Sequence, residues 1–242
     1  MPDSPADPIV LLHGALGARA QLLPLAAALT DAGHAAVHVV EFGGHGETPD
    51  DGAPWEVARF GAQVLAAMDA AGVARATVFG YSMGGYVALQ LAAAHPARVA
   101  AVVTLGTKLA WTPAVAAREG GRLDAATIRA KVPRFADQLV ERHAGSGGWE
   151  RVLARTAALL RALGDDPPLT EAALRTIACP VRVLVGDRDG TVTLEECAAA
   201  ARTLPQGALG VLPRTGHALE QVELDRLVRE VLAAAAEAAP GV

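Results

Sequence analysis

The chain has 242 residues, of which 52% are hydrophobic, 4% are aromatic and 19% are charged. This length is ample for a buried core, and the hydropathy excludes an intrinsically disordered protein. The 26 acidic and 21 basic side chains give a formal charge of −5 and are mixed along the sequence, so no basic run is available to bind nucleic acid or an anionic membrane surface.

Apolar runs and helical patterns alternate along the first 107 residues. Four apolar runs are typical of strands, at residues 8–12, 34–42, 77–80 and 99–105. Helical patterns lie between them, at residues 21–31, 54–72 and 83–94. Because continuous apolar strands separated by helices are typical of a sheet buried on both faces, the pattern predicts a parallel sheet covered by helices.

The alternation stops at Lys108. Residues 108–177 contain helical patterns but no convincing strand. The alternation then resumes with a strand at 181–185, a helix opened by the capping box of Thr193 and Glu196, a strand at 209–212 and a helix at 220–236. We therefore predict one α/β domain, formed by residues 1–107 and 178–242, with a helical insertion at 108–177 that is a candidate lid.

The segment Gly80-Tyr81-Ser82-Met83-Gly84 lies where a predicted strand meets a helix. A serine on so tight a turn needs a positive φ, and glycines two residues before and after it relieve the crowding. The N–H groups that begin the helix favour a developing negative charge. Only three serines occur in the chain, so a chance match at this junction is improbable, and the pattern predicts a nucleophile.

A serine hydroxyl needs a base, and the base needs an acid that fixes its tautomer. Among seven histidines, His217 is best placed, because it follows the last predicted strand and precedes the C-terminal helix. The loop after the strand at 181–185 offers two acids, Asp187 and Asp189, and spacing alone does not choose between them. The remaining histidines are placed in strands, glycine-rich loops, a helix end and the insertion: His13, His34, His38, His45, His95 and His143.

The order Ser82, then Asp187 or Asp189, then His217 resembles the α/β-hydrolase superfamily, whose triads follow this order. Four further segments are similar to motifs of that family, and the resemblance extends from Ile9 to the C-terminal helix. They are the oxyanion loop at His13–Gly17, the D-x-x-G-H-G-x-S loop at Glu41–Thr48 (with Glu for Asp and Thr for Ser), the acid loop at Gly186–Asp189 and the Gly216-His217 pair.

The resemblance implies an α/β-hydrolase fold with about six parallel strands, helices on both faces and a helical lid. It favours Asp189 as the acid, and it makes His13 and His45 structural or near-site residues. It also implies an oxyanion hole formed by the backbone N–H groups of Ala15 and Met83, with Leu16 the less favoured neighbour. Larger members begin with an antiparallel hairpin; eight residues precede Ile9, so we expect that hairpin to be absent.

These residues predict acyl transfer without a cofactor or a metal, since no HExxH, paired Cys/His spacing, GxGxxG after a strand or GxxxxGK is present. We expect a carboxylesterase-like serine hydrolase that acts on a small-molecule ester of small to medium, mainly apolar character. Thioester, lactone or C–C bond hydrolysis, a lyase of the menaquinone-pathway type, and a non-catalytic ligand-binding relative remain alternatives.

The pocket should lie under the insertion, where the candidate lining residues are Trp111, Phe135 and Trp149, each of which also suits packing within the insertion.

The sequence also bears on where the protein is found. No apolar run reaches the length of about 18 residues that a spanning helix needs, and the first seven residues lack the basic and apolar stretches of a signal peptide. The two cysteines, Cys179 and Cys197, fit one disulfide or a reducing compartment equally well. We expect a cytoplasmic protein with no membrane or nucleic-acid partner.

Overall fold

The computed structural model describes residues 7–34 and 36–238. Six strands form one sheet in the order β2-β1-β3-β4-β5-β6, and every neighbouring pair is parallel. The predicted six-stranded parallel sheet is therefore confirmed. The strands are β1 (Ile9–Leu12), β2 (Val37–Val40), β3 (Ala76–Tyr81), β4 (Val99–Leu105), β5 (Val181–Gly186) and β6 (Gly207–Leu212).

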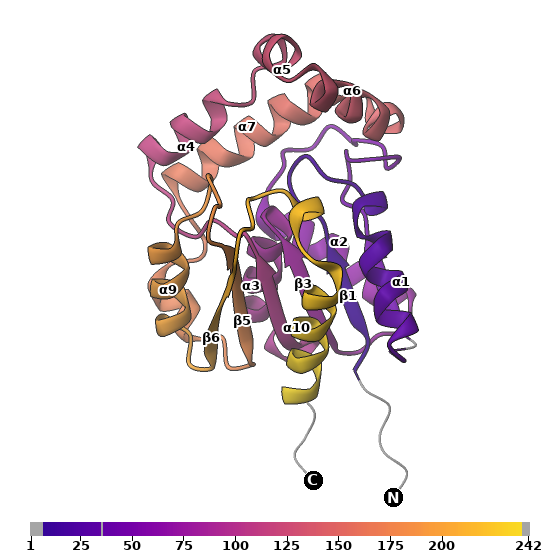
Figure 1. Cartoon of the computed structure of the whole chain (residues 1–242), viewed down its shortest axis with the longest axis vertical. Coiled ribbons are helices and arrows are strands. Elements are labelled where there is room, and N and C mark those ends of the chain that lie inside the picture. The colour runs from indigo at the N-terminus through magenta and orange to yellow at the C-terminus, as the bar shows by residue number, and fades with distance from the viewer. Residues whose placement is uncertain (1–6, 35, 239–242) are drawn as a thin grey trace, which may run out of the picture.

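Helices cover both faces of the sheet (Figure 1). One face carries α1 (Leu23–Asp31) and α10 (Leu224–Glu237), and the other carries α2 (Val57–Ala70), α3 (Met83–Ala94) and α9 (Leu194–Thr203). Short 3-10 helices lie at Arg19–Leu22, Pro96–Arg98, Ala144–Ser146 and Leu219–Gln221. The strand order reverses between β1 and β3, and open α/β sheets place their sites beyond the carboxyl ends of the strands at such a point.

The helical insertion, residues 108–177, lies between β4 and β5 and contains no strand. Its helices are α4 (Pro113–Gly121), α5 (Ala125–Lys131), α6 (Pro133–Arg142), α7 (Trp149–Asp165) and α8 (Glu171–Arg175). Helices α4 to α7 lie above the carboxyl ends of the strands (Figure 1). The end of the insertion returns to the sheet, where Leu169, Leu174 and Ile177 are buried in the core beside α3.

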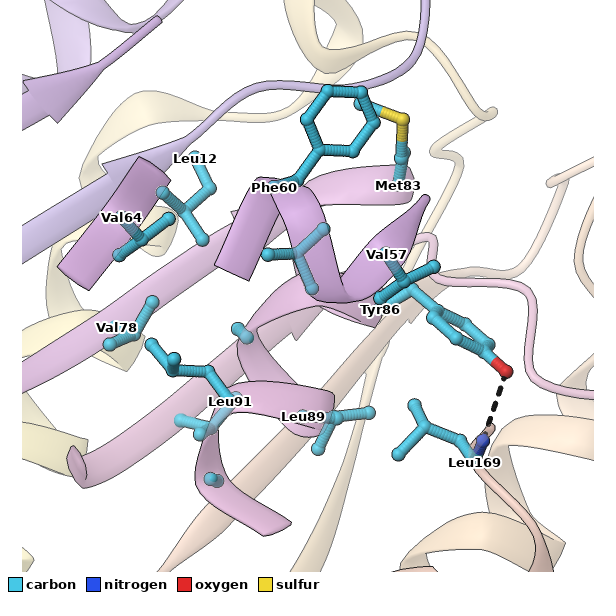
Figure 2. Close-up of a cluster of buried hydrophobic side chains, with 14 of the residues drawn as sticks. Leu12, Val57, Phe60, Val64, Val78, Met83, Tyr86, Leu89, Leu91 and Leu169 are labelled. Carbon is cyan, nitrogen blue, oxygen red and sulfur yellow. Dashed lines mark hydrogen bonds between the residues drawn. The ribbon is translucent and has the colours of Figure 1, made fainter. Parts of the chain in front are cut away.

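The core on the α3 side fixes the helix that follows Ser82. Phe60, Val64 and Leu91 are fully buried there (Figure 2). The Tyr86 hydroxyl accepts a hydrogen bond from the Leu169 N–H at 3.2 Å, which joins α3 to the returning end of the insertion. Packing of this helix therefore depends on a segment that is distant from it in the chain.

The remaining sequence expectations concern an N-terminal hairpin, a membrane-spanning helix, the two cysteines and a signal peptide. Within residues 7–34 and 36–238, β2 is an edge strand and no antiparallel strand joins the sheet, and no helix is long and apolar enough to cross a membrane. Cys179 and Cys197 are both free thiols. Residues 1–6, on which most of the expectation about a signal peptide rests, lie outside the described residues.

Candidate active site

Ser82 occupies the turn between β3 and α3 with φ 52° and ψ −114°. The positive φ predicted from the sequence is confirmed, and so is the need for flanking glycines. A Cβ atom on Gly80 would overlap the Gly84 carbonyl, and one on Gly84 would lie 2.5 Å from the Leu12 carbonyl oxygen. The Ser82 N–H donates to the Leu105 carbonyl at 2.8 Å, which fixes the turn to β4.

Asp189 lies beside the His217 ring. Its Oδ2 is 2.8 Å from His217 Nδ1, and its Oδ1 accepts the N–H groups of Thr191 and Val192 at 2.8 and 2.9 Å. Burial alone raises the pKa of Asp189, but the hydrogen bond and charge of His217 and the two N–H donors outweigh it and lower that pKa below its ordinary value. Asp189 is therefore ionised at neutral pH and holds His217 by Nδ1.

Asp187 takes a different position. Its side chain is exposed, and its Oδ1 accepts the Thr215 N–H at 3.1 Å. Asp187 thus fixes the loop that leads to His217, as an aspartate often fixes a turn. Of the two acids that the sequence leaves open, the structure brings Asp189 and not Asp187 to the His217 ring.

Ser82 and His217 line the same two cavities, although no hydrogen bond joins the Ser82 hydroxyl to the His217 ring within the described residues. Such bonds are often long before a substrate binds. The His217 carbonyl accepts the Tyr81 hydroxyl at 3.1 Å. Burial, followed by the charges of Glu220 and Asp189, raises the pKa of Tyr81, so the phenol stays protonated and able to donate.

The loop from Gly14 to Gly17 is closed by a hydrogen bond from the Gly17 N–H to the Gly14 carbonyl at 2.9 Å. Within the described part of the chain, the N–H groups of Ala15, Leu16 and Met83 donate no hydrogen bond. All three residues border the cavity that holds Ser82. The site therefore has free N–H donors where the oxyanion is expected to bind. The structure does not decide whether Ala15 or Leu16 would be the donor beside Met83.

Three buried histidines surround this loop. His13 Nδ1 is 2.8 Å from the Gly14 carbonyl, and its Nε2 accepts the Phe42 N–H at 3.1 Å. His45 Nε2 is 2.9 Å from the Ala15 carbonyl. Burial is the main cause that lowers the pKa of both rings. Both rings are therefore neutral and are held against the loop by these hydrogen bonds; that neither is the base stays a prediction of the resemblance.

His143 is the third of these histidines and comes from the insertion. Its Nδ1 accepts the Gly46 N–H at 3.1 Å, and its Nε2 is 3.2 Å from the Leu16 carbonyl. Burial is the main cause that lowers the pKa of His143 to about 4; the bond to the Leu16 carbonyl opposes it, and the neighbouring His45 and Arg142 lower the pKa further. Sequence reasoning placed this residue only in the helical insertion and assigned it no function.

The Glu41 side chain closes the neighbouring loop. Its carboxylate accepts the N–H of Arg19 at 2.9 Å and, on the other oxygen, the N–H of Glu47 and the hydroxyl of Thr48 at 3.0 and 3.1 Å. The glutamate and threonine that depart from the family pattern therefore contact each other.

Two cavities meet at Ser82 and His217. The first has a volume of about 240 Å³, lies between the sheet edge and the insertion as the sequence predicts, and is mainly apolar. Its lining from the insertion includes Trp111, Leu123, Leu159, Leu160 and Leu163. The second, of about 520 Å³, is lined by Phe135 together with the polar side chains Gln21, Gln138, Arg142 and Glu220. Trp149 lines neither cavity and packs against Ile128, Leu139 and Leu153 inside the insertion.

The insertion is anchored to the site at its beginning by a buried ion pair. Lys108 Nζ lies 2.9 Å from Glu196 Oε2 and also donates to the Thr191 carbonyl at 3.2 Å. The other oxygen of Glu196 accepts the N–H groups of Leu109 and Ala110 at 3.0 and 3.4 Å. Because Thr191 also donates to Asp189, the first turn of the insertion and the acid loop are held together.

Two residues that follow β4, Gly106 and Thr107, were not predicted from the sequence as parts of the site. Gly106 has φ 58°, and a Cβ there would lie 3.2 Å from both Asp189 Oδ2 and His217 Nδ1. Thr107 donates its hydroxyl to the Ser82 carbonyl at 3.0 Å. The only signal in the sequence for Gly106 was its place directly after an apolar strand, and a glycine there also fits an ordinary turn.

Within the described residues, no group of three or more His, Cys, Asp or Glu side chains is arranged to hold a metal ion.

Comparison with known proteins gives both a family and individual relatives. A family model described as the alpha/beta hydrolase fold matches residues 7–148. The chain is 32% identical over 228 residues, 87% of each chain, to a pimeloyl-[acyl-carrier protein] methyl ester esterase of Xanthomonas campestris pv. campestris. It is 29% identical over 202 residues, 78% of this chain and 72% of the other, to a 2-hydroxymuconate semialdehyde hydrolase of Pseudomonas putida. A solved thermophilic esterase from Thermogutta terrifontis shares the fold, with a TM-score of 0.76, 21% identity and coverage of 98% of this chain and 92% of its own.

We predict that stability falls as the pH drops from about 6.5 to about 4. The folded-state pKa of His143, about 4, lies below the value in the unfolded chain, which is roughly 6.5. Between these values the unfolded chain binds more protons, so acid favours unfolding. The charged or titratable groups around the ring are His45, Arg142 and Glu41. The melting temperature should fall less steeply in His143→Gln than in the wild type, and an identical slope would contradict this account.

Proposed function

The chain belongs to the alpha/beta hydrolase fold family, and from this premise we propose that it is a serine hydrolase with Ser82 as nucleophile, His217 as base and Asp189 as acid. The observation that supports the proposal most strongly is the 2.8 Å contact between His217 and the buried carboxylate of Asp189, beside the strained turn of Ser82. If His217 were only a solvent-exposed loop residue, we would not expect its ring to contact the buried carboxylate of Asp189. A base for the adjacent serine needs that partner.

In the proposed reaction, Ser82 Oγ attacks a substrate carbonyl and transfers its proton to His217 Nε2. Asp189 keeps the proton of Nδ1 in place and stabilises the imidazolium. The N–H groups of Met83 and Ala15 bind the oxyanion, aided by the start of α3. His217 then protonates the leaving group, and water, activated by the same ring, releases the acyl group from Ser82.

We propose a carboxylic ester as the substrate class, and a carboxylesterase-like activity. The apolar cavity of about 240 Å³ suits a small to medium apolar group on one side of the ester. The second cavity has polar walls and room for a larger or more hydrated group on the other side. That a relative acts on a methyl ester is consistent with this class. We further propose that the protein is cytoplasmic and that residues 108–177 act as its lid.

A second candidate is hydrolysis of an anionic substrate by the same residues. The observation that favours it is Arg142, whose half-buried guanidinium lines the second cavity next to Ser82. Within the described residues, no carboxylate forms an ion pair with Arg142, although Glu220 lines the same cavity and its charge acts on the guanidinium. A carboxylate on the substrate would pair with this cation. The semialdehyde hydrolase among the relatives makes this class worth assaying beside simple esters.

Replacing Ser82 by alanine should abolish hydrolysis of p-nitrophenyl esters, because it removes the hydroxyl that forms the proposed acyl-enzyme. We expect the wild type to prefer short and medium acyl chains, and Ser82→Ala to lose activity by roughly 10⁴-fold or more. The melting temperature should change little. Ser146→Ala, which alters the other serine of the described residues, is the control and should retain activity. Full activity in Ser82→Ala would contradict the mechanism.

The two acids of the loop after β5 should differ in effect. Asp189→Asn offers His217 the wrong hydrogen-bonding partner, and kcat should fall by up to about 10⁴-fold. Asp187→Asn keeps an oxygen that can accept the Thr215 N–H, so its loss should be within about tenfold. Steady-state kinetics on one ester measures both. The opposite ranking would assign the acid to Asp187.

A further inference from the structure

Three successive carbonyl groups of the Gly14–Gly17 loop each meet a ring nitrogen of a different histidine. The Gly14 carbonyl meets His13 at 2.8 Å, the Ala15 carbonyl meets His45 at 2.9 Å, and the Leu16 carbonyl meets His143 at 3.2 Å. All three rings are buried.

Each of these contacts also sets the direction of an N–H group. A trans peptide is planar, so the carbonyl of one residue and the N–H of the next point in opposite directions. When His13 holds the Gly14 carbonyl, the Ala15 N–H must therefore point away from His13. When His45 holds the Ala15 carbonyl, the Leu16 N–H must likewise point away from His45. These are the free donors at the Ser82 cavity. Holding the Leu16 carbonyl orients the Gly17 N–H, which closes the turn on the Gly14 carbonyl.

His143 differs from the other two histidines in its origin. His13 belongs to the loop's own strand end, and His45 to the neighbouring loop, whereas His143 follows α6 in the insertion. Its hydrogen bonds define one tautomer. Since Nδ1 accepts the Gly46 N–H, the ring proton is on Nε2 and is donated to the Leu16 carbonyl. One neutral ring thus joins the insertion to both loops beside Ser82.

We propose that His143 is a positioning residue of the hydrolysis proposed above: by holding the Leu16 carbonyl from the insertion, it keeps the Gly14–Gly17 turn closed and its free N–H groups aimed at the oxyanion. The inference rests on the proposed function. It makes the insertion a support of the proposed oxyanion hole as well as a cover over the pocket.

The surroundings of His143 require a neutral ring. Arg142 NH1 donates to the same Leu16 carbonyl at 2.8 Å, so a protonated ring would face this guanidinium across one oxygen atom. A proton on Nδ1 would also point at the Gly46 N–H and break that bond. The charge that His45 carries when it is protonated would add to this repulsion, and Glu41 is the acidic group that opposes it.

Two amide variants separate the functions of the two ring nitrogens. In His143→Gln, the longer side-chain amide reaches the position of Nε2 and can still donate to the Leu16 carbonyl. The shorter amide in His143→Asn reaches the position of Nδ1 and can only replace the contact with the Gly46 N–H. His143→Phe keeps an aromatic ring and removes both contacts.

The test measures kcat, KM and the inhibition constant of a trifluoromethyl ketone whose adduct carries an oxyanion. For His143→Phe and His143→Asn we expect kcat to fall by about 10- to 100-fold with KM nearly unchanged. The inhibition constant should rise by the same factor as kcat/KM falls. His143→Gln should restore kcat to within about threefold of the wild type. His34→Gln is the matched control: His34 is also buried and contacts a backbone carbonyl, that of Asp7, away from the site.

Other results would overturn the inference. If all three variants melt at lower temperature but keep wild-type kcat per folded molecule, His143 is only structural. Equal rescue by asparagine and glutamine would also contradict a function at the Leu16 carbonyl. A wild-type protein that hydrolyses no ester and binds no ketone would instead refute the proposed function, which distinguishes the two failures.

Discussion

At Ser82 the backbone passes from β3 into α3 with a φ of 52°, a conformation that costs a residue other than glycine about 1–3 kcal/mol. The surrounding structure maintains it. The Ser82 N–H is bound by the Leu105 carbonyl, and the Ser82 carbonyl by the Thr107 hydroxyl. Glycines at 80 and 84 remove the side chains that would otherwise overlap the neighbouring backbone. The rest of the site is arranged around this turn, because it projects the hydroxyl above the sheet and begins α3 at the same point.

The insertion contributes to the site from two ends. The buried pair of Lys108 and Glu196 joins its first residues to the loop that carries Asp189. Arg142 and His143 join its far side to the Leu16 carbonyl. Between these anchors, leucines of α7 and the residues Trp111 and Leu123 on either side of α4 supply the apolar wall of the first cavity. Such contacts favour a cover that is formed before the substrate arrives, and they link its position to the geometry of the proposed oxyanion hole.

Most of the fold and the residues of the proposed triad could be predicted because their signals are local. Apolar runs and helical spacing identified the strands, and the five residues around Ser82 identified the tight turn. Spacing alone left Asp187 and Asp189 open, and the resemblance to the family's acid loop, in which the acid stands three residues after the glycine, favoured Asp189. By contrast, His143 meets Gly46 and Leu16 across about a hundred residues of sequence, and Gly106 is confined by Asp189 and His217 from other loops. Contacts of this kind depend on packing between distant segments, so no local pattern contains them. For Trp149 the sequence offered both pocket lining and packing within the insertion, and the structure shows the packing, beside Ile128 and Leu139.

The central claim is that Ser82 is activated by His217, and covalent labelling tests it most directly. A fluorophosphonate reacts with an activated serine and adds a fixed mass that peptide mapping can locate. The account predicts a single adduct on Ser82 that is lost in His217→Ala. An adduct on another residue, an adduct on Ser82 that persists in His217→Ala, or no adduct on the folded wild-type protein would contradict it.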